Sequence, residues 1–189
     1  MGLFGQRDLL IFIAQLLSLY HIKYLLTGSF AVSYYGVPRA THDIDFIIEV
    51  TEKSLPKLQS AMKTLGKEFL ADIPNIQNAV KERSMFNIYH LETGIKVDFW
   101  IIKTQDFQMK MKRGHDISFD KHVIHVISAE DLILNKLVWC KEVMSERHMR
   151  DCVGIWNVQG EQLDANYLKK QAKVLGVTEL FQEITKSSL

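Results

Sequence analysis

The stretch that most constrains the fold of this chain is residues 25–49, LLTGSFAVSYYGVPRATHDIDFIIE. It begins with an apolar run, breaks at Gly28, and continues as a helix-like segment over residues 29–35. A second apolar run then opens with Asp43 and Asp45. Short apolar runs bounded by glycine and proline are typical of buried strands. The stretch therefore predicts a strand, a tight turn, a helix and a second strand that begins with two carboxylates.

The two carboxylates are expected on one face of the second strand. Successive side chains of a strand alternate faces and each residue rises about 3.3 Å, so Asp43 and Asp45 lie roughly 6.6 Å apart at the backbone. Ile44 and Phe46 would then face the core. Magnesium takes oxygen ligands at about 2.0 to 2.1 Å, and paired catalytic metals lie about 3.5 to 4 Å apart. The spacing predicts a site for a divalent ion between the carboxylates.

The turn at Gly28 and Ser29 complements the acidic strand. A turn that follows a strand and precedes a helix presents backbone N–H groups and a helix N-terminus to an anion. Gly28 allows the backbone to approach closely, and Ser29 is expected to cap the helix. Arg39 lies in the loop that leads to the acidic strand, where it could meet a phosphate, although an exposed loop arginine is the commoner case.

A third carboxylate, Asp98, stands inside the apolar run of residues 94–102. A charge in such a strand is costly unless it is paired or bound to a metal. Residues 84–91 and 95–102 form a predicted β-hairpin, joined by a tight turn that contains glycine. If the second of these strands is central in the sheet, the hairpin places Asp98 beside the first two carboxylates.

Periodicity and breaker residues predict the remaining elements. Helices are expected at residues 8–20, 51–65 and 75–83, short strands at 67–70 and 122–127, and a helix or loop at 107–113. From residue 128 to the end only helices are expected: one that starts at Ser128, and others at 145–159, 167–175 and 178–186. The order predicts an α/β (α+β) fold with a mixed β-sheet flanked by helices. We expect two parts: a core of residues 1–127 and a C-terminal helical segment, residues 128–189, packed on it.

Two of the later helices carry charged residues whose positions indicate what they contact. Lys136 falls on a helix face whose other residues are apolar, and a lysine among apolar neighbours is rarely without a partner. It either extends to solvent or reaches an anionic ligand. Arg147 and Asp151 are four residues apart on the next helix, and the plainest interpretation is a surface ion pair.

The composition is that of an ordinary globular protein of 189 residues, 47% hydrophobic and 24% charged. A net charge of +1 argues against a protein coated in nucleic acid or held on a membrane by charge. The apolar run of residues 9–20 is too short to span a bilayer and lacks the features of a signal peptide. Cys140 and Cys152 have no metal-ligand spacing and suit the core of a protein in a reducing compartment. A cytoplasmic protein with no membrane partner is expected.

The order Gly-Ser, thirteen residues, Asp-x-Asp resembles the signature of the DNA polymerase β-like nucleotidyltransferase superfamily. In that superfamily a third Asp on a neighbouring strand completes the set, a position that Asp98 would fill here. The resemblance implies that Asp43, Asp45 and Asp98 hold Mg²⁺ or Mn²⁺. It also implies that Gly28 and Ser29 bind the phosphates of an NTP.

A second resemblance covers roughly residues 24–180. The run AEDLILNKL, which begins at Ala129, and the later Arg150-Asp151 resemble motifs of AbiEii-type nucleotidyltransferases, the toxin component of bacterial toxin–antitoxin and phage-defence systems. In that family a lysine on one helix and an aspartate on the next complete the nucleotide site, which implies catalytic roles for Lys136 and Asp151. The family also implies an antitoxin partner. This sequence is shorter than typical AbiEii toxins.

The resemblances imply transfer of NMP from an NTP to an acceptor hydroxyl, with release of pyrophosphate. Asp98 would bridge the metals or act as a base toward the hydroxyl, and Lys136 would offset charge on the triphosphate. Three classes of acceptor stay open: an RNA end such as that of tRNA, a protein side chain, or a small molecule.

Two other interpretations compete with a transferase. One is a catalytically inactive module of the same fold that binds a nucleotide or a partner, since fold alone does not fix function. The other is a structural domain with accidental motifs, which requires Gly28 and the three carboxylates to lie apart in space.

Overall fold

The structure is a computed structural model that describes residues 5–187. The described residues divide into two compact units. Unit 1 contains the residues up to Ser29 together with Thr41–Val126. Unit 2 contains Phe30–Ala40 and the residues from Ile127 onward, so a short segment from early in the chain belongs with the C-terminal helices.

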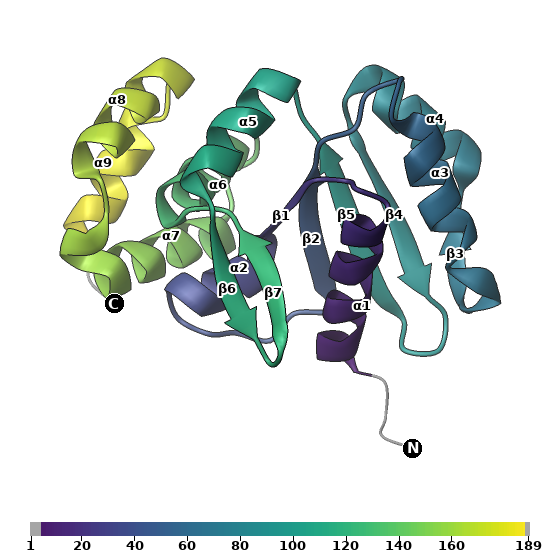
Figure 1. Cartoon of the computed structure of the whole chain (residues 1–189). Helices are drawn as coiled ribbons and strands as arrows, with labels where there is room; N and C mark the ends of the chain where they lie inside the picture. The colour runs from purple at the N-terminus through teal and green to yellow at the C-terminus, as the bar shows by residue number, and fades with distance from the viewer. Residues whose placement is uncertain (1–4, 188–189) are drawn as a thin grey trace. The chain divides into compact units, whose positions relative to one another are not determined.

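Unit 1 is built on a seven-stranded mixed sheet (Figure 1). Its strands lie in the order β3 (Phe69–Ala71), β4 (Met85–His90), β5 (Ile95–Ile101), β2 (Asp43–Ile48), β1 (Tyr24–Thr27), β7 (His122–Val126) and β6 (His115–Phe119). β2 runs parallel to β5 and antiparallel to β1, and β1 runs parallel to β7. The β4–β5 and β6–β7 pairs are antiparallel hairpins. The mixed α/β fold expected from the sequence is confirmed.

One face of this sheet carries the apolar core. Side chains alternate along a strand, so Phe86, Phe99 and Phe46 of the neighbouring strands β4, β5 and β2 point the same way. Their rings stack in a row, with centroids 4.8 Å and 5.9 Å apart. α1 (Gln6–Leu19), α3 (Leu55–Lys63) and α4 (Ile73–Glu82) contact one another in turn and form a helical layer beside the sheet (Figure 1). The opposite face of the central strands carries Asp43, Asp45 and Asp98, together with apolar residues such as Leu25 and Ile47.

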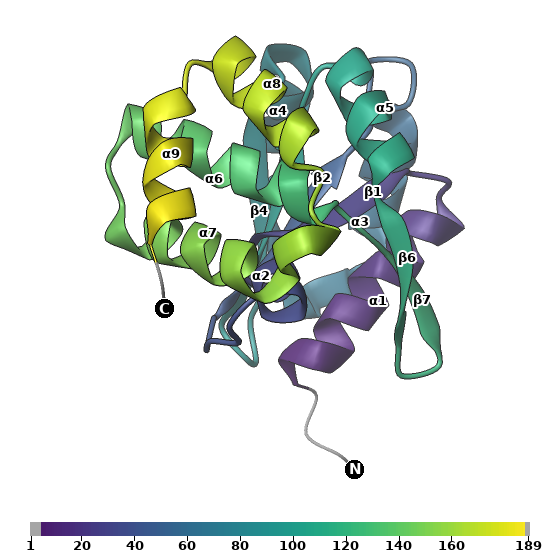
Figure 2. The same ribbon diagram turned by 90° about the vertical axis from the view of Figure 1, so that its left-hand side faces the viewer.

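Unit 2 is helical. It contains α2 (Gly28–Tyr35) from Phe30 on, together with α6 (Ala129–Glu142), α7 (Glu146–Gln159), α8 (Ala165–Leu175) and α9 (Thr178–Lys186). α6 and α7 lie side by side, and α9 contacts both α7 and α8 (Figure 2). The end of α2 is tied to this group because the Tyr35 hydroxyl donates to the Ile127 carbonyl at 2.7 Å and the Gln159 amide donates to the Tyr35 carbonyl at 2.6 Å.

Three local expectations differ from the structure. β6 was not predicted, because its sequence HDISF buries only Ile117 and so lacks a clear apolar pattern. The helix expected at residues 51–65 is shorter, since residues 52–54 form a turn before α3. The segment left open between helix and loop is a helix, α5 (Thr104–Arg113).

The two cysteines lie in the core, as expected. Cys140 and Cys152 are buried free thiols. His122 contacts Gln15, and His125 contacts Asp116. None of the helices that the structure describes is long and apolar enough to cross a membrane.

Candidate active site: a carboxylate cluster on the central strands

The acidic strand has the geometry that its sequence predicts. β2 begins at Asp43, and its residues alternate between the two faces of the sheet. Ile44 and Phe46 are fully buried, whereas Asp43 and Asp45 are both partly accessible. The two carboxylates therefore project from the face opposite the phenylalanine row.

Asp98 lies directly beside this pair. β5 is central and runs parallel to β2, and Asp98 is the register partner of Asp45. Register partners on adjacent strands project from the same face. The structure thus brings Asp43, Asp45 and Asp98 to one face of two neighbouring strands, and the interpretation that the motifs are accidental is wrong.

Gly28 completes the arrangement from β1. Thr27, the last residue of β1, is the register partner of Asp45, so the chain turns into α2 directly beside the Asp45 side chain. Gly28 has a φ of +63°, a conformation that side chains other than glycine rarely adopt. A Cβ at Gly28 would overlap the Asp45 carboxylate and lie 2.7 Å from the Cβ of Asp45. The glycine is needed for both backbone conformation and space.

Ser29 differs from its expected role. α2 begins at Gly28, so Ser29 lies inside the first turn of the helix and is not its cap. Its side chain is buried. The groups that an α-helix leaves without intrahelical partners at this position are the backbone N–H groups of its first turn.

Lys96 is a residue of this site that the sequence did not single out. It lies two positions before Asp98 on β5 and is the register partner of Asp43. Its ammonium Nζ is 2.8 Å from Asp98 Oδ2 and 3.7 Å from Asp43 Oδ1. The signal that could have revealed it is the alternation Lys-x-Asp in the strand of the third carboxylate, which puts both charges on one face.

Burial controls the charges of this pair. Asp98 is 8% exposed at its side chain, and burial raises the pKa of its carboxyl above the usual 3.8 despite the nearby Lys96. Lys96 is 28% exposed; burial would lower the pKa of its ammonium, but the hydrogen bond to Asp98 and the charges of Asp98 and Asp43 together outweigh burial and raise it. The lysine therefore stays charged beside a carboxylate that is costly to ionise.

The donor atoms suit a hard cation. Asp98 Oδ1 is buried and has no hydrogen-bond partner among the described residues, and neither has the hydroxyl Oγ1 of Thr27. A buried acceptor without a partner costs free energy that a ligand can recover. As the described side chains stand, no three His, Cys, Asp or Glu residues converge closely enough to hold a metal. The ammonium of Lys96 lies between two of the three carboxylates, and the oxygen chemistry otherwise fits Mg²⁺.

Unit 2 contains a second charged cluster, around Asp151. Lys136 donates from Nζ to Asp151 Oδ2 at 2.8 Å. Arg39 donates from Nε to Oδ1 at 2.9 Å and from Nη2 to Oδ2 at 3.0 Å, a bidentate contact. Two cations thus share one carboxylate and link α6, α7 and the segment after α2.

The structure excludes one of the two alternatives for Lys136 and corrects one expectation about Asp151. Lys136 is 1% exposed and does not extend to solvent. Asp151 is buried and pairs with Lys136 and Arg39, so the expected surface pair with Arg147 is wrong. The sequence pattern placed Asp151 four residues from Arg147 but carried no signal for partners from other elements.

The cluster retains an excess of positive charge. Burial would raise the pKa of Asp151, but the Arg39 hydrogen bonds and the Lys136 charge outweigh it and hold that pKa below 3.8. His148 is 3.5 Å from the Lys136 ammonium, and burial and then the Lys136 charge lower the pKa of its imidazole below 6.5. With His148 neutral, two cations face one carboxylate, and the net charge of these four groups is positive.

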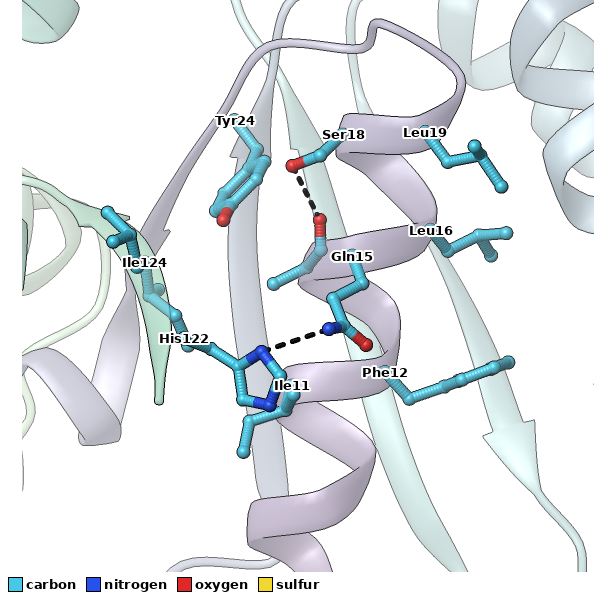
Figure 3. A pocket seen from close by; sticks show the side chains of 11 residues that line it. Ile11, Phe12, Gln15, Leu16, Ser18, Leu19, Tyr24, His122 and Ile124 are labelled. Carbon is cyan, nitrogen blue, oxygen red and sulfur yellow. Dashed lines mark hydrogen bonds between the residues drawn. The ribbon is translucent and has the colours of Figure 1, made fainter. Parts of the chain in front are cut away.

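Unit 1 also has a hollow of about 640 Å³ beside α1 and β7 (Figure 3). It is formed mainly by apolar side chains of α1 and β7, and Tyr24 lines it. Tyr24 has the same strand orientation as Leu26, whose partner is Phe46, so the hollow belongs to the phenylalanine face. The Gln15 amide and His122 are joined by a hydrogen bond of 2.9 Å at its rim (Figure 3). The hollow contains none of the predicted site residues.

Solved structures resemble this fold at low sequence identity. The antibiotic-resistance factor ANT(2'')-Ia has a TM-score of 0.60 and 13% identity over 94% of this chain and 91% of its own. The lincosamide antibiotic adenylyltransferase LnuA, solved with lincomycin bound, has a TM-score of 0.56 and 16% identity over 82% and 98%. An antigenic nucleotidyltransferase-like protein from Paracoccidioides brasiliensis has a TM-score of 0.54 and 14% identity over 92% of each chain. At these identities the likeness shows a shared nucleotidyltransferase-type fold.

Family membership rests on the sequence itself. A search of curated proteins gives no match. The family model described as "Nucleotidyl transferase AbiEii toxin, Type IV TA system" matches residues 11–179, most of the chain. The match includes the Gly-Ser turn, all three carboxylates and the Lys136–Asp151 pair. The chain therefore belongs to the AbiEii family of nucleotidyl transferase toxins.

Proposed function

We propose that this protein transfers a nucleoside monophosphate from an NTP to an acceptor hydroxyl, with Mg²⁺ or Mn²⁺ held by Asp43, Asp45 and Asp98. The acceptor oxygen forms a bond to the α-phosphorus, the bond from that phosphorus to the β-phosphate oxygen breaks, and pyrophosphate leaves. The observation that carries the proposal is the register pairing of Asp45 with Asp98, with Gly28 against Asp45.

Each group of unit 1 has a role that its position supports. The N–H groups at Gly28 and Ser29 would bind phosphate oxygens at the first turn of α2. Asp98, whose burial raises its pKa, is suited to accept the proton of the acceptor hydroxyl. A bound divalent ion supplies charge neutralisation for the triphosphate and polarises the attacking oxygen. Catalysis then consists mainly of positioning and electrostatic stabilisation.

The cluster in unit 2 supports a nucleotide-binding role for Arg39 and Lys136. The net charge of the cluster is positive, and a positive charge attracts the negatively charged triphosphate. Asp151 holds both cations in fixed positions through the short contacts described above. We propose that Lys136 and Asp151 act in the nucleotide site in this way, with Asp151 positioning the cations.

The acceptor is proposed by class only. An RNA end, such as that of tRNA, agrees with the toxin family, and a protein side chain or small molecule are the other two classes. LnuA and ANT(2'')-Ia are antibiotic-modifying relatives in fold. The family description, a toxin–antitoxin system, supports an antitoxin partner and a cytoplasmic site of action.

The test is a screen with α-labelled NTPs, total cell RNA, cell lysate and a small-molecule fraction as separate acceptors. We expect label in one fraction, dependence on Mg²⁺ or Mn²⁺, and its loss in Asp45→Asn and Asp98→Asn. Asp116→Asn, an exposed carboxylate in the same unit, is the matched control. Equal labelling by the wild type and Asp98→Asn would refute the proposed site.

A second candidate is a nucleotide-binding module without turnover. The contact of Lys96 with Asp98 and Asp43 favours it, because a paired carboxylate is less available to a metal. Binding of an NTP with no release of pyrophosphate under any acceptor would select this candidate. Turnover with any of the acceptors would exclude it.

A further inference from the structure

We propose that Lys96 is a built-in counter-ion of the carboxylate site, which a divalent metal ion must displace before Asp43 and Asp98 can both bind the metal. The inference deepens the proposed function and rests on it, since it concerns the same carboxylates. It assigns a counter-ion role to Lys96, which is not one of the three carboxylates or part of the Gly-Ser turn.

Strand geometry directs the lysine toward both acids. Lys96 and Asp98 are two residues apart on β5 and so share one face, and Lys96 lies opposite Asp43 in the parallel register. The resulting distances from Nζ are 2.8 Å to Asp98 Oδ2 and 3.7 Å to Asp43 Oδ1. The ammonium therefore occupies the space between oxygen atoms that would otherwise bind a cation.

The charges explain why such a group is useful. Three carboxylates on adjacent strands repel one another, and one ammonium offsets part of that repulsion when no metal is bound. An ammonium and a divalent ion that contact the same oxygens also repel each other, and more strongly where the surroundings are partly buried. Binding of the metal and retention of the Lys96 contacts are consequently in competition.

The lysine is the member of the pair that can move. Its side chain is 28% exposed, and its four-carbon stem has several rotatable bonds, so the ammonium can turn toward water. Asp98 is 8% exposed and is fixed on a central strand. Its second oxygen, Oδ1, has no hydrogen-bond partner among the described residues, so a metal can make a first contact there. Lys96 must then leave Oδ2 and Asp43 before both carboxylates bind the ion.

The first experiment measures binding of Mn²⁺ alone to the full chain, by the electron paramagnetic resonance signal of free Mn²⁺. We expect Lys96→Gln to bind Mn²⁺ about tenfold more tightly than the wild type, because a competing cation is gone. Lys23→Gln is the matched control: it removes the same charge and another lysine–carboxylate pair of unit 1, Lys23 with Glu49 at 3.2 Å. The control should bind as the wild type does.

The outcomes separate this inference from the proposed function. If Lys96→Gln binds Mn²⁺ no more tightly than the wild type while Asp98→Asn abolishes binding, the role of Lys96 is refuted and the metal site stands. If neither the wild type nor Lys96→Gln binds Mn²⁺, the metal site itself is refuted, and the role of Lys96 with it.

A second measurement uses the wild type alone and so does not depend on how a variant folds. Acetic anhydride modifies free amines, and the modified lysines are counted by mass spectrometry. We expect acetylation of Lys96 to rise severalfold when Mn²⁺ is added, with Lys23 unchanged. If the acetylation of Lys96 stays the same or falls while Mn²⁺ is bound, displacement is refuted.

Discussion

Gly28 and Asp45 share one small space at the end of β1, where a Cβ on the glycine would lie 2.7 Å from the Cβ of the aspartate. Thr27 and Asp45 are register partners, so the turn into α2 is built against the acidic strand. The positive φ of Gly28 and its contact with Asp45 have one cause, the tight connection between a strand and a helix beside a carboxylate. The contact between Gly28 and Asp45 predicts how a substitution of Gly28 would act.

Gly28→Ala is expected to reduce both stability and activity. A left-handed backbone costs a residue with a Cβ roughly 1–2 kcal/mol, and overlap with Asp45 adds a further cost of about 1–3 kcal/mol. Because Asp45 must shift, transfer of label should fall about a hundredfold or more. Urea unfolding and the labelling assay measure the two effects.

Gly94→Ala is the control for this substitution. Gly94 has a φ of +67°, close to that of Gly28, and a Cβ there would meet nothing within 4 Å. It should show the cost of the backbone conformation without the loss of activity. If both variants lose activity equally, the contact between Gly28 and Asp45 has no functional importance.

Asp98→Asn is expected to abolish transfer without lowering the stability of the metal-free protein. Burial makes the ionised Asp98 costly, so a neutral amide of the same shape removes that cost. Melting temperatures in EDTA should be equal to or above that of the wild type. Adding Mg²⁺ with an NTP should raise the melting temperature of the wild type but not of Asp98→Asn. A lower melting temperature in EDTA would mean that Asp98 is needed for packing.

Asp151→Asn is expected to destabilise the protein by about 3–5 kcal/mol, because it leaves two cations without their shared buried carboxylate. Asp120→Asn is the control, since its pair with Arg7 is about half exposed and should contribute less than about 1 kcal/mol. Urea unfolding at pH 7 compares them. If Asp151→Asn lowers the unfolding free energy as little as Asp120→Asn does, the buried cluster does not stabilise the fold.

The effect of Asp151 should depend on pH with a definite sign. The pKa of Asp151 is held below its usual 3.8, so the folded protein favours the charged form more than the unfolded chain does. The stabilisation is therefore complete above about pH 4 and is lost as the pH falls through the folded pKa. The gap in unfolding free energy between the wild type and Asp151→Asn should be constant from pH 7 to 5 and shrink below pH 4. A gap that widens on acidification would contradict the ion-pair explanation.

Cys152 offers a probe of the same helices. It is fully buried, and burial raises the pKa of its thiol, so it should react with a disulfide reagent only when unit 2 opens. Asp151→Asn should speed this reaction about a hundredfold if opening becomes easier by roughly 3 kcal/mol. The rate is followed spectroscopically under native conditions, with Asp120→Asn expected to match the wild type. Equal rates in all three proteins would show that the Asp151 cluster does not control the opening of unit 2.

The sequence determined much of the site on unit 1. Alternation along a strand fixes that Asp43 and Asp45 share a face, and the apolar run around Asp98 shows that its charge needs a partner. Both inferences depend on local backbone geometry, which a short segment largely sets by itself. The strand at residues 115–119 escaped prediction because an edge strand with one buried residue carries almost no pattern.

Only the tertiary structure decided which distant groups meet. The parallel register of β2 and β5 pairs Asp45 with Asp98 and brings Lys96 to Asp43, and no spacing along the chain encodes that register. The same holds for Asp151, whose partners come from another helix and from the segment after α2 rather than from its own helix. Local pattern determines which face a side chain takes, while the packing of elements far apart in sequence determines which charges lie within bonding distance.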